Sequence, residues 1–336
     1  MDDLDAFILK TPLIDRWQAS EIHEVQRDQP NRCRTYLASN PSGQRGFIKV
    51  LPPSTEDLRM MQLHLEEFFA EKAIVELCAE RKMRRIVRAL AFGNVTVPGI
   101  ISVTLHYLVF EWADHDMRSL VTDTDEAQLQ AALACMHHMA TALQELHLSK
   151  IAHQNLRPAA VLRFEDATHK LGDFRHALQA GVPRTEATNF PDATHAPPEL
   201  LYGKKIESFD DRYAVDMYQL GALGLSLLTG VGATAQLSRQ LTGLHHWRNW
   251  QGSFADVLPH LAHAHEHMMH TLRNQLPESV RVDLGTAIHQ LTDPDPARRG
   301  HPTNVIGAGS RYGLERYISL FDVLRSRVVL RGRGAA

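Results

Sequence analysis

Two short segments near the middle of the chain place polar side chains between apolar ones. The first, HQNLRPAAVL, begins at His153 and contains Asn155 and Arg157, and the second, LGDFR, contains Asp173. A single carboxylate between apolar neighbours can bind a metal ion, or it can hold a loop by accepting backbone N–H groups. Closer to the N-terminus, Lys49 and Glu71 add a cation and a second carboxylate. The arrangement of the two central segments resembles a phosphate-transferring active site.

The elements that would position these residues follow from the apolar pattern. Residues 33–53 form two strand-like runs on either side of the turn-forming segment NPSGQ, so Lys49 falls on the second strand of a hairpin. Residues 55–85 contain no glycine or proline and repeat apolar side chains at helical spacing, which predicts a helix that carries Glu71. Two further β-branched and aromatic runs, 86–93 and 99–112, predict more strands of the same antiparallel sheet.

After Asp116 the pattern becomes helical. It predicts helices over residues 126–150, 213–229, 253–275 and 280–291. The C-terminal segment also predicts a helix, whose apolar stripe is Leu314, Tyr317, Ile318, Phe321, Leu324 and Val328. We expect this stripe to pack on the larger helical part of the protein, with a docking surface for a partner as the alternative.

The composition limits the classes of function. The chain has 336 residues, of which 44% are hydrophobic and 22% charged, and its formal net charge of -3 gives no reason to expect a nucleic-acid partner. Its three cysteines are far apart and form no CxxC pair, which favours a reducing compartment, and we expect the cytoplasm. The N-terminus does not resemble a secretory signal, and the most apolar later segment, from Met217, is too short to span a bilayer. We therefore expect no membrane partner.

The order and spacing of several short segments between residues 20 and 305 resemble the signature set of the protein kinases. The resemblance implies ATP and Mg²⁺ as cofactors, with Lys49 on the nucleotide phosphates and Glu71 holding that lysine. It also implies a hinge between two lobes that begins at Glu111. The nucleotide-binding set implied by the resemblance is Lys49, Glu71, Glu111, Ala113, Leu162 and Asp173, and Asp173 would also bind the metal.

The same resemblance implies an α+β fold with two lobes. A small antiparallel sheet lobe with one helix would cover residues 20–111, and a larger, mainly helical lobe would cover residues 112–305. Residues 1–19 would form an N-terminal extension, and residues 306–336 an amphipathic helix with a basic tail. In the larger lobe, Glu199 and Arg299 would form a stabilising ion pair.

The catalytic segment departs from the family pattern at three positions. The general-base aspartate corresponds to Asn155, whose amide has no basic form near neutral pH and cannot accept the substrate proton. The lysine two residues later corresponds to Arg157, a planar cation that could keep a phosphate contact in altered geometry. The asparagine that binds a second Mg²⁺ corresponds to Ala160, which offers no oxygen ligand. These changes predict the loss of the base and of one metal position.

Three further departures affect nucleotide binding. A glycine-rich segment is expected to cover the phosphates, yet no glycine occurs between Trp17 and Tyr36. Phe47 stands where a small residue would form the floor of the adenine pocket. Arg175 replaces the glycine after Asp173–Phe174 and could project its charge to the place where Mg²⁺ would lie.

Two functions remain open. The departures favour a pseudokinase that acts as a protein-interaction, scaffolding or allosteric module, with another protein as partner and with nucleotide binding weak or absent. The alternative is an active, atypical Ser/Thr protein kinase that binds ATP and a single Mg²⁺ through Asp173, because positioning and charge supply much of the rate of phosphoryl transfer. Lys49 and Glu71 could contact nucleotide, or they could persist as a structural ion pair.

A cluster of histidines is a separate feature of the sequence. His260, His263, His267 and His270 fall on one face of the helix predicted over residues 253–275. Adjacent turns of a helix can bind a metal, but no HExxH motif or supporting carboxylate pattern accompanies them. We expect a solvated face, with metal binding or pH sensing as the alternative.

Overall fold

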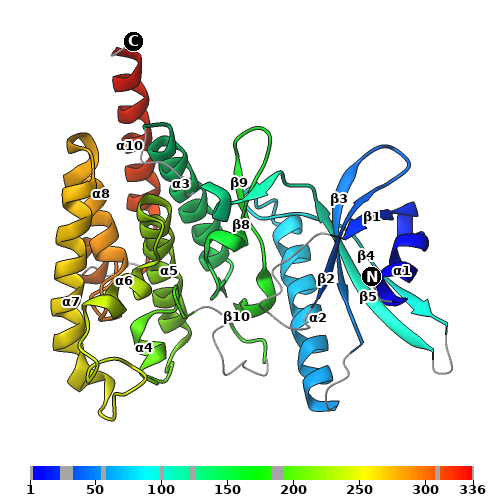
Figure 1. The fold of residues 1–336 in the computed structure, drawn as a ribbon, viewed down its shortest axis with the longest axis horizontal. Coiled ribbons are helices and arrows are strands. Elements are labelled where there is room, and N and C mark those ends of the chain that lie inside the picture. The colour runs from blue at the N-terminus through cyan, green and yellow to red at the C-terminus, as the bar shows by residue number, and fades with distance from the viewer. Residues whose placement is uncertain are drawn as a thin grey trace. The chain divides into compact units, whose positions relative to one another are not determined.

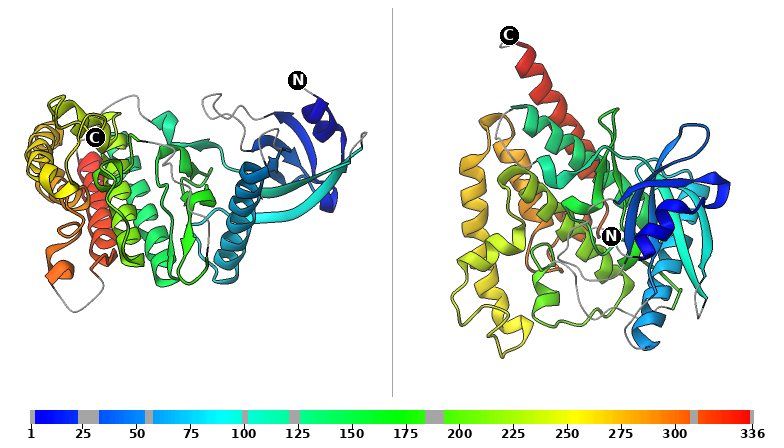
Figure 2. Two further views of the ribbon diagram at one scale, coloured as in Figure 1. Left: turned by 90° about the horizontal axis from the view of Figure 1, so that it is seen from below. Right: turned by 45° about the vertical axis from the view of Figure 1, so that its right-hand side comes forward.

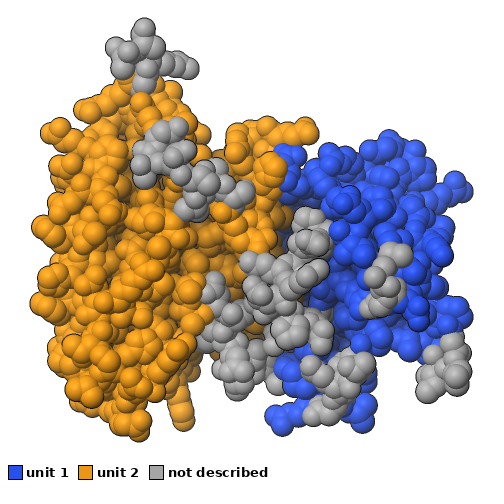
Figure 3. Space-filling view, viewed as in Figure 1, with its two compact units in different colours: residues 1–114, 183–185 blue, residues 115–182, 186–336 orange. Residues whose placement is uncertain are grey.

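The structure is a computed structural model that describes residues 3–22, 33–53, 58–98, 102–120, 126–183, 193–306 and 311–334. It divides into two compact units (Figure 3). Unit 1 comprises Met1–Asp114 and Pro183–Thr185, and unit 2 comprises His115–Val182 and Glu186–Ala336. Unit 1 is built on an antiparallel sheet and unit 2 is mainly helical (Figure 1). The predicted α+β class, with a small sheet lobe and a larger helical lobe, is confirmed.

Unit 1 contains a five-stranded sheet in the order β1-β2-β3-β5-β4, with antiparallel neighbours throughout. Its strands are β1 (Gln18–Ile22), β2 (Arg34–Ser39), β3 (Arg45–Leu51), β4 (Ala89–Val97) and β5 (Val103–Glu111). Its helices are α1 (Asp3–Lys10), the short 3₁₀ turn η1 (Ile14–Arg16) and α2 (Leu58–Glu80). The hairpin and the glutamate-bearing helix lie where the sequence predicts them, whereas α1 and β1 were not predicted.

The turn between β2 and β3 follows from local chemistry. The Asn40 side chain accepts hydrogen bonds from the backbone N–H groups of Ser42 and Gln44, at 3.2 and 3.0 Å. Gly43 adopts a positive φ of 81°, which glycine tolerates without steric cost. These contacts set the register that pairs Thr35 with Lys49 across the hairpin.

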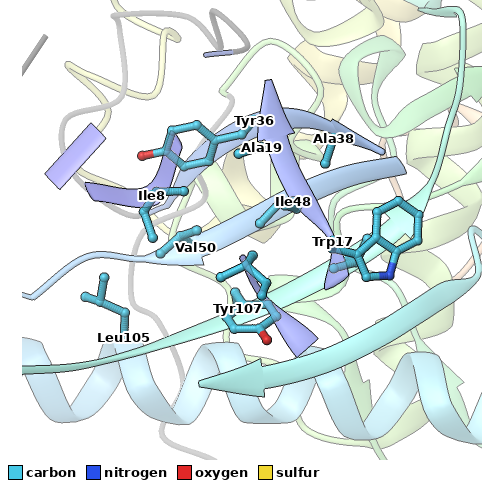
Figure 4. Packing of buried hydrophobic residues seen from close by; sticks show 11 residues of the cluster. Ile8, Trp17, Ala19, Tyr36, Ala38, Ile48, Val50, Leu105 and Tyr107 are labelled. Carbon is cyan, nitrogen blue, oxygen red and sulfur yellow. The ribbon is translucent and has the colours of Figure 1, made fainter. Parts of the chain in front are cut away.

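The apolar core of unit 1 lies on one face of the sheet. Side chains of β3 alternate, so that Ile48 and Val50 point into this core while Phe47 and Lys49 point to the opposite face. The core residues drawn and labelled in Figure 4 are Ile8, Trp17, Ala19, Tyr36, Ala38, Ile48, Val50, Leu105 and Tyr107.

The predicted N-terminal extension therefore forms part of this core. Ile8 of α1 and Trp17, which follows η1, are buried among the sheet side chains (Figure 4). Gly46 makes room for the indole ring, because a Cβ at that position would lie 2.7 Å from Trp17. The extension covers the sheet face opposite to the one that carries Lys49.

Unit 2 consists of helices and several very short strands. Its longer helices are α3 (Glu126–Leu148), α5 (Phe209–Thr229), α7 (Phe254–Gln275), α8 (Glu278–Leu291) and α10 (Glu315–Gly334). The shorter ones are η2 (Met117–Leu120), η3 (Pro158–Ala160), η4 (Phe174–His176), α4 (Pro198–Leu201), α6 (Ala233–Gln240) and α9 (Pro302–Ile306). Its strands are β6 (His115–Asp116), β7 (Ile151–Ala152), β8 (Val161–Arg163), β9 (His169–Leu171) and β10 (Leu178–Gln179).

Helix α5 is the buried centre of unit 2. A capping box formed by Ser208 and Asp211 begins the helix, and residues Ala214–Leu227 are buried without interruption. Helices α3, α6 and α8 pack against it. A helix that is covered on several sides needs apolar side chains around its whole circumference. This burial explains the apolar segment that begins near Met217.

Helix α10 lies along α3 (Figure 2). Its stripe is buried as predicted for a helix packed on the larger lobe, at Leu314, Tyr317, Phe321, Leu324 and Val328.

Among the described residues, no single helix combines the length and apolarity that a membrane span requires. Helices α5 and α6, bent by 82° relative to each other, meet the criterion only when taken as a pair.

Candidate functional site

The segment from His153 to Arg157 follows β7 and is held in place by α5. Asp216 accepts hydrogen bonds from the backbone N–H groups of His153 and Gln154, at 2.8 and 2.7 Å. Gln219, one turn along the helix, accepts from the N–H of Leu156 and donates to the carbonyl of Gln154. Asp216 is fully buried, and its carboxylate also accepts the Gln154 side-chain amide at 3.1 Å and lies 2.9 Å from His147 Nε2. The loop is therefore rigidly anchored in unit 2.

His153 joins this loop to the segment that contains Asp173. Its Nε2 lies 2.9 Å from the carbonyl oxygen of Gly172, and its ring stands edge-on to Phe174, at 5.0 Å between centroids. Burial lowers the pKa of His153 below its ordinary value, although the nearby Asp216 opposes that effect. A neutral, fully enclosed imidazole acts in packing and hydrogen bonding.

Asp173 is surrounded by hydrogen-bond donors of the protein itself. Arg175 donates from Nε to Oδ1 at 2.7 Å and from Nη2 to Oδ2 at 3.2 Å. Arg157 donates from Nη2 to Oδ2 at 3.2 Å, and Asn155 donates from Nδ2 to the same oxygen at 3.0 Å. Both carboxylate oxygens are thus engaged, and two guanidinium groups neutralise their charge. We call Asn155, Arg157, Asp173 and Arg175 the Asp173 cluster.

This arrangement does not fit a magnesium ion. Mg²⁺ needs carboxylate lone pairs at about 2.0–2.1 Å and a nearly ideal octahedron of oxygen ligands. At Asp173 the lone pairs already accept N–H groups, and a divalent cation there would face two fixed positive charges. Ala160 provides a buried methyl group where a second oxygen ligand would be needed. The cluster is an internal ion-pair network.

The backbone of the cluster is also constrained. Asp173 adopts the left-handed region, with φ 59° and ψ 62°, which is uncommon for a residue with a side chain. The carbonyl of Ala160 accepts the N–H of Gly172 at 2.8 Å, which fixes the start of this turn. Leu162, predicted to contact nucleotide, is half-buried on β8 and pairs with Lys170 in the register of β8 and β9.

In unit 1, Lys49 and Glu71 form a buried ion pair. Lys49 Nζ lies 2.5 Å from Glu71 Oε2, and the two residues are 9% and 2% exposed. Phe47 lies two residues before Lys49 on the same face of β3, in register with Leu37 on β2 and Phe110 on β5. The aromatic ring therefore belongs to the face of the sheet that carries the lysine.

The two predicted hinge residues belong to unit 1. Glu111 accepts the N–H of Arg88 at 2.8 Å through its Oε1, and its own N–H donates to the Arg88 carbonyl at 3.0 Å. Ala113 is half-buried two residues later. The intervening Trp112 carries the Arg45 guanidinium over its ring, at 3.7 Å from the centroid. Glu111 thus has a structural role, because its hydrogen bonds with the backbone of Arg88 fix the end of β5.

Within unit 2 the structure brings together Asn155, Arg157 and Asp173, and within unit 1 it brings together Lys49 and Glu71. The sequence did not predict that Asp216 and Gln219 hold the loop. Only their polar side chains inside an otherwise apolar segment distinguish them. The predicted segment that would cover the phosphates includes residues 23–32, which lie outside the described residues.

Two further predictions concern unit 2. Glu199 and Arg299 form the predicted ion pair, with two hydrogen bonds of 2.7 and 2.9 Å between buried side chains. The predicted histidine face on α7 is exposed at His260, His263, His267 and His270. Among the described residues, no group of three or more His, Cys, Asp or Glu side chains is arranged to hold a metal ion.

The sequence of the chain is similar to those of known proteins. A family model for the protein kinase domain matches residues 40–306. The chain is 29% identical over 206 residues to a probable cyclin-dependent kinase 10 of Dictyostelium discoideum, which covers 57% of this chain and 54% of that protein. It is 30% identical over 137 residues to the serine/threonine-protein kinase SBK1 of Danio rerio, with 39% and 35% covered. It is 26% identical over 169 residues to cyclin-dependent kinase 2 of Caenorhabditis elegans, with 46% and 44% covered.

The chain thus spans about half the length of the first of these curated relatives and less of the other two. The family match is much broader, because it covers most of this chain and includes the loop anchored on α5, the Lys49–Glu71 pair and the Glu199–Arg299 pair. Typical members of this family use ATP and Mg²⁺. The chain belongs to the protein kinase family.

Proposed function

We propose that this member of the family is a pseudokinase, which acts by binding another protein and does not transfer phosphate. The observation that carries the proposal is the Asp173 cluster, in which both oxygens of the metal-binding carboxylate accept hydrogen bonds from Asn155, Arg157 and Arg175. Phosphoryl transfer needs cations that bridge the phosphates and a group that orients or deprotonates the acceptor hydroxyl. Neither role has a suitable side chain in this cluster.

The rest of the fold supports a binding role. The loop that would carry the catalytic base is anchored to α5 by Asp216 and Gln219, and the Glu199–Arg299 pair is intact. These contacts preserve the architecture of the family while the chemistry at Asp173 is altered. A rigid fold with an inactive site is suited to scaffolding or allosteric binding, because function is located in the site and not in the fold.

An active, atypical Ser/Thr kinase is the second candidate. The observation in its favour is the buried Lys49–Glu71 pair, which has the residue types that hold nucleotide phosphates in the family. The same pair also ties α2 to β3, and that structural role is sufficient to retain it. We rank this candidate second because it requires Asp173 to release two arginines before it can bind a metal.

We further propose that the partner is a protein, that the chain works in the cytoplasm, and that it binds neither nucleic acid nor membrane. The support is compositional. The net charge of -3 provides no excess of positive charge for nucleic acid or anionic lipid, and the three separated cysteines suit a reducing compartment.

A phosphotransfer assay with radiolabelled ATP and Mg²⁺ tests the proposal, with autophosphorylation and a basic protein substrate as readouts. We expect the wild-type chain to transfer no more phosphate than Asp173→Ala, and we expect Asn155→Asp alone to change nothing, because the metal site stays blocked. The triple variant Asn155→Asp/Ala160→Asn/Arg175→Gly, which removes the block and supplies ligands, is the informative comparison. Robust transfer by the wild type that Asp173→Ala abolishes would overturn the proposal.

A further inference from the structure

We propose that His263 and His267 of α7 form a two-histidine site for a divalent ion of the Ni²⁺, Cu²⁺ and Zn²⁺ class. The site lies on a different helix from the Asp173 cluster and does not rest on the proposed function. It concerns a face of unit 2 that takes no part in the contacts of that cluster.

Helix α7 carries four histidines on its solvent-exposed face. Its other face packs on α6 and α8 and buries apolar side chains such as Leu261 and Met268 (Figure 1). The exposed histidines are His260, His263, His267 and His270. In an α-helix, residues three or four positions apart are neighbours on one face. Adjacent histidines of this face are therefore close enough for two rings to share one ion.

The histidines at the two ends of this face already have contacts within the protein. The ring of His260 is stacked on that of His245, at 3.6 Å between centroids. The ring of His270 lies against Asn274, with 3.2 Å between its Nε2 and the side-chain amide nitrogen. Other side chains of unit 2 thus hold both of these rings.

The inner pair, His263 and His267, differs from the end histidines. Their rings meet edge to face, at 4.9 Å between centroids. Among the described residues, neither ring has a hydrogen-bond or ion-pair partner, so the acceptor nitrogen of each neutral imidazole is available to a ligand. An ion bound to two imidazoles lies about 2.0–2.1 Å from each nitrogen, and exposed rings at this separation can reach it by a change of rotamer.

The ligand type selects the metal. Imidazole nitrogen suits Ni²⁺, Cu²⁺ and Zn²⁺, whereas Mg²⁺ prefers oxygen ligands. Histidines at positions i and i+4 are also the spacing by which one helix presents two ligands to zinc in the HExxH motif. The adjacent carboxylate, Glu266, pairs instead with His289 of α8, at 2.9 Å. The spacing and the ring chemistry therefore favour a late transition ion.

The site provides two ligands from the protein. Within the described part of the chain, no third His, Cys, Asp or Glu side chain completes a metal-binding group with them. Water would fill the remaining positions of the ion, as it fills the open position of a catalytic zinc site. We therefore expect weaker binding than in a structural zinc site, which has four protein ligands.

Isothermal titration of the full chain, prepared without a histidine tag, tests the inference with Zn²⁺, Ni²⁺ and Mg²⁺ as probes. We expect Zn²⁺ and Ni²⁺ to bind with one ion per chain at this site, and Mg²⁺ to give no heat of binding there. This comparison needs only the wild type, so a substitution that prevents folding does not affect it. Absence of binding of both Zn²⁺ and Ni²⁺ would overturn the inference.

Variants assign the ion to the inner pair. His263→Gln and His267→Gln should each weaken Zn²⁺ binding by at least about tenfold, because one ring alone cannot chelate the ion. Two control variants should leave the affinity unchanged. His115→Gln removes an exposed histidine outside α7, and His270→Gln removes an end histidine of the same face. A loss in His270→Gln as large as that in His267→Gln would contradict the assignment.

Electron paramagnetic resonance with Cu²⁺ reads the coordination directly. We expect two nitrogen ligands in the wild type and one in either single variant of the inner pair. A spectrum with oxygen ligands alone in the wild type would refute the site. Failure of the metal site leaves the pseudokinase proposal intact, and phosphotransfer that overturns that proposal leaves the metal site intact, because the two experiments probe different residues.

Discussion

Asn155 donates a hydrogen bond to the same carboxylate oxygen that accepts from Arg157. An amide has no basic form near neutral pH, so Asn155 cannot act as a base. Its hydrogen bond helps to hold Asp173 in place. Arg175 completes the set by bonding to both carboxylate oxygens. The substitutions at these positions cooperate in one network, so reversing a single one of them leaves the others holding the carboxylate.

The Glu199–Arg299 pair gives a stability prediction at the scale of single residues. Glu199→Ala would leave the fully buried Arg299 without its counter-charge, and we expect it to lower the free energy of unfolding by about 3–5 kcal/mol. Urea denaturation measures this change. The matched control is Asp322→Ala, which breaks the exposed Asp322–Arg325 pair and should cost less than about 1 kcal/mol. Equal effects of the two variants would contradict the structural role of the buried pair.

His265 gives a prediction of pH dependence. It is buried in α7, with Nε2 2.9 Å from the Thr292 hydroxyl, and burial lowers its pKa to about 3. Electrostatic interactions with His289 and with the guanidinium groups of Arg299, Arg273 and Arg298 lower that pKa further. In the unfolded chain its pKa is about 6.5, so unfolding takes up a proton between those two values. The contribution of His265 is therefore present above about pH 6.5 and is lost as the pH falls toward 3.

The wild type should lose about 2 kcal/mol more stability than His265→Gln between pH 7 and pH 5. Urea denaturation at a series of pH values measures the difference. Comparing the two proteins isolates this residue, because His153 remains in both and its lowered pKa acts in the same direction. Parallel pH profiles would show that His265 does not titrate abnormally.

At the scale of elements, α10 completes the core of unit 2 by burying its apolar stripe against α3. Phe321→Ala would leave a cavity at a fully buried ring, and we expect a loss of about 3–5 kcal/mol in the free energy of unfolding. Val323→Ala, on the same helix but 54% exposed, is the control and should change stability by less than about 0.5 kcal/mol. Thermal or urea unfolding of the full chain checks both. A loss at Phe321 no greater than at Val323 would show that the helix does not pack as described.

The elements differ in how well the sequence predicts them. The hairpin β2–β3 and helices α2, α3, α5, α7, α8 and α10 carry long periodic patterns or strong turn formers, and each lies where that pattern indicates. Helix α1 has only 8 residues, and β1 has 5 residues without regular alternation of burial, so neither carries enough signal. Their contribution to the core depends on Trp17 meeting Gly46 of β3, a contact that only the folded sheet creates.

The parts of the candidate site that lie in the family's sequence motifs could be predicted from the sequence. The Lys49–Glu71 and Glu199–Arg299 pairs follow from the spacing of the family segments, and Arg175 was expected to place its charge near Asp173. The contacts of Asp216 and Gln219 with the loop join residues more than 60 positions apart in the chain. Such contacts depend on the position of α5 in the fold, so local patterns cannot reveal them.

At the scale of the whole molecule, the two units retain different structural features of the protein kinase family. Unit 1 keeps a buried lysine–glutamate pair, and its sheet gains an additional covered face from α1 and Trp17. Unit 2 keeps the anchored loop and the buried ion pair, and its Arg157 and Arg175 pair with the Asp173 carboxylate. The fold of the family is preserved, and the donors around Asp173 are the basis of the proposed pseudokinase role.

Anomalous diffraction from crystals grown with ATP and Mn²⁺ tests most directly whether the protein's own side chains occupy the metal position at Asp173. The account predicts no anomalous peak at bonding distance from the Asp173 carboxylate, with Arg175 Nε still hydrogen-bonded to Oδ1. A Mn²⁺ ion bonded to Asp173, with Arg157 and Arg175 displaced from it, would contradict the account.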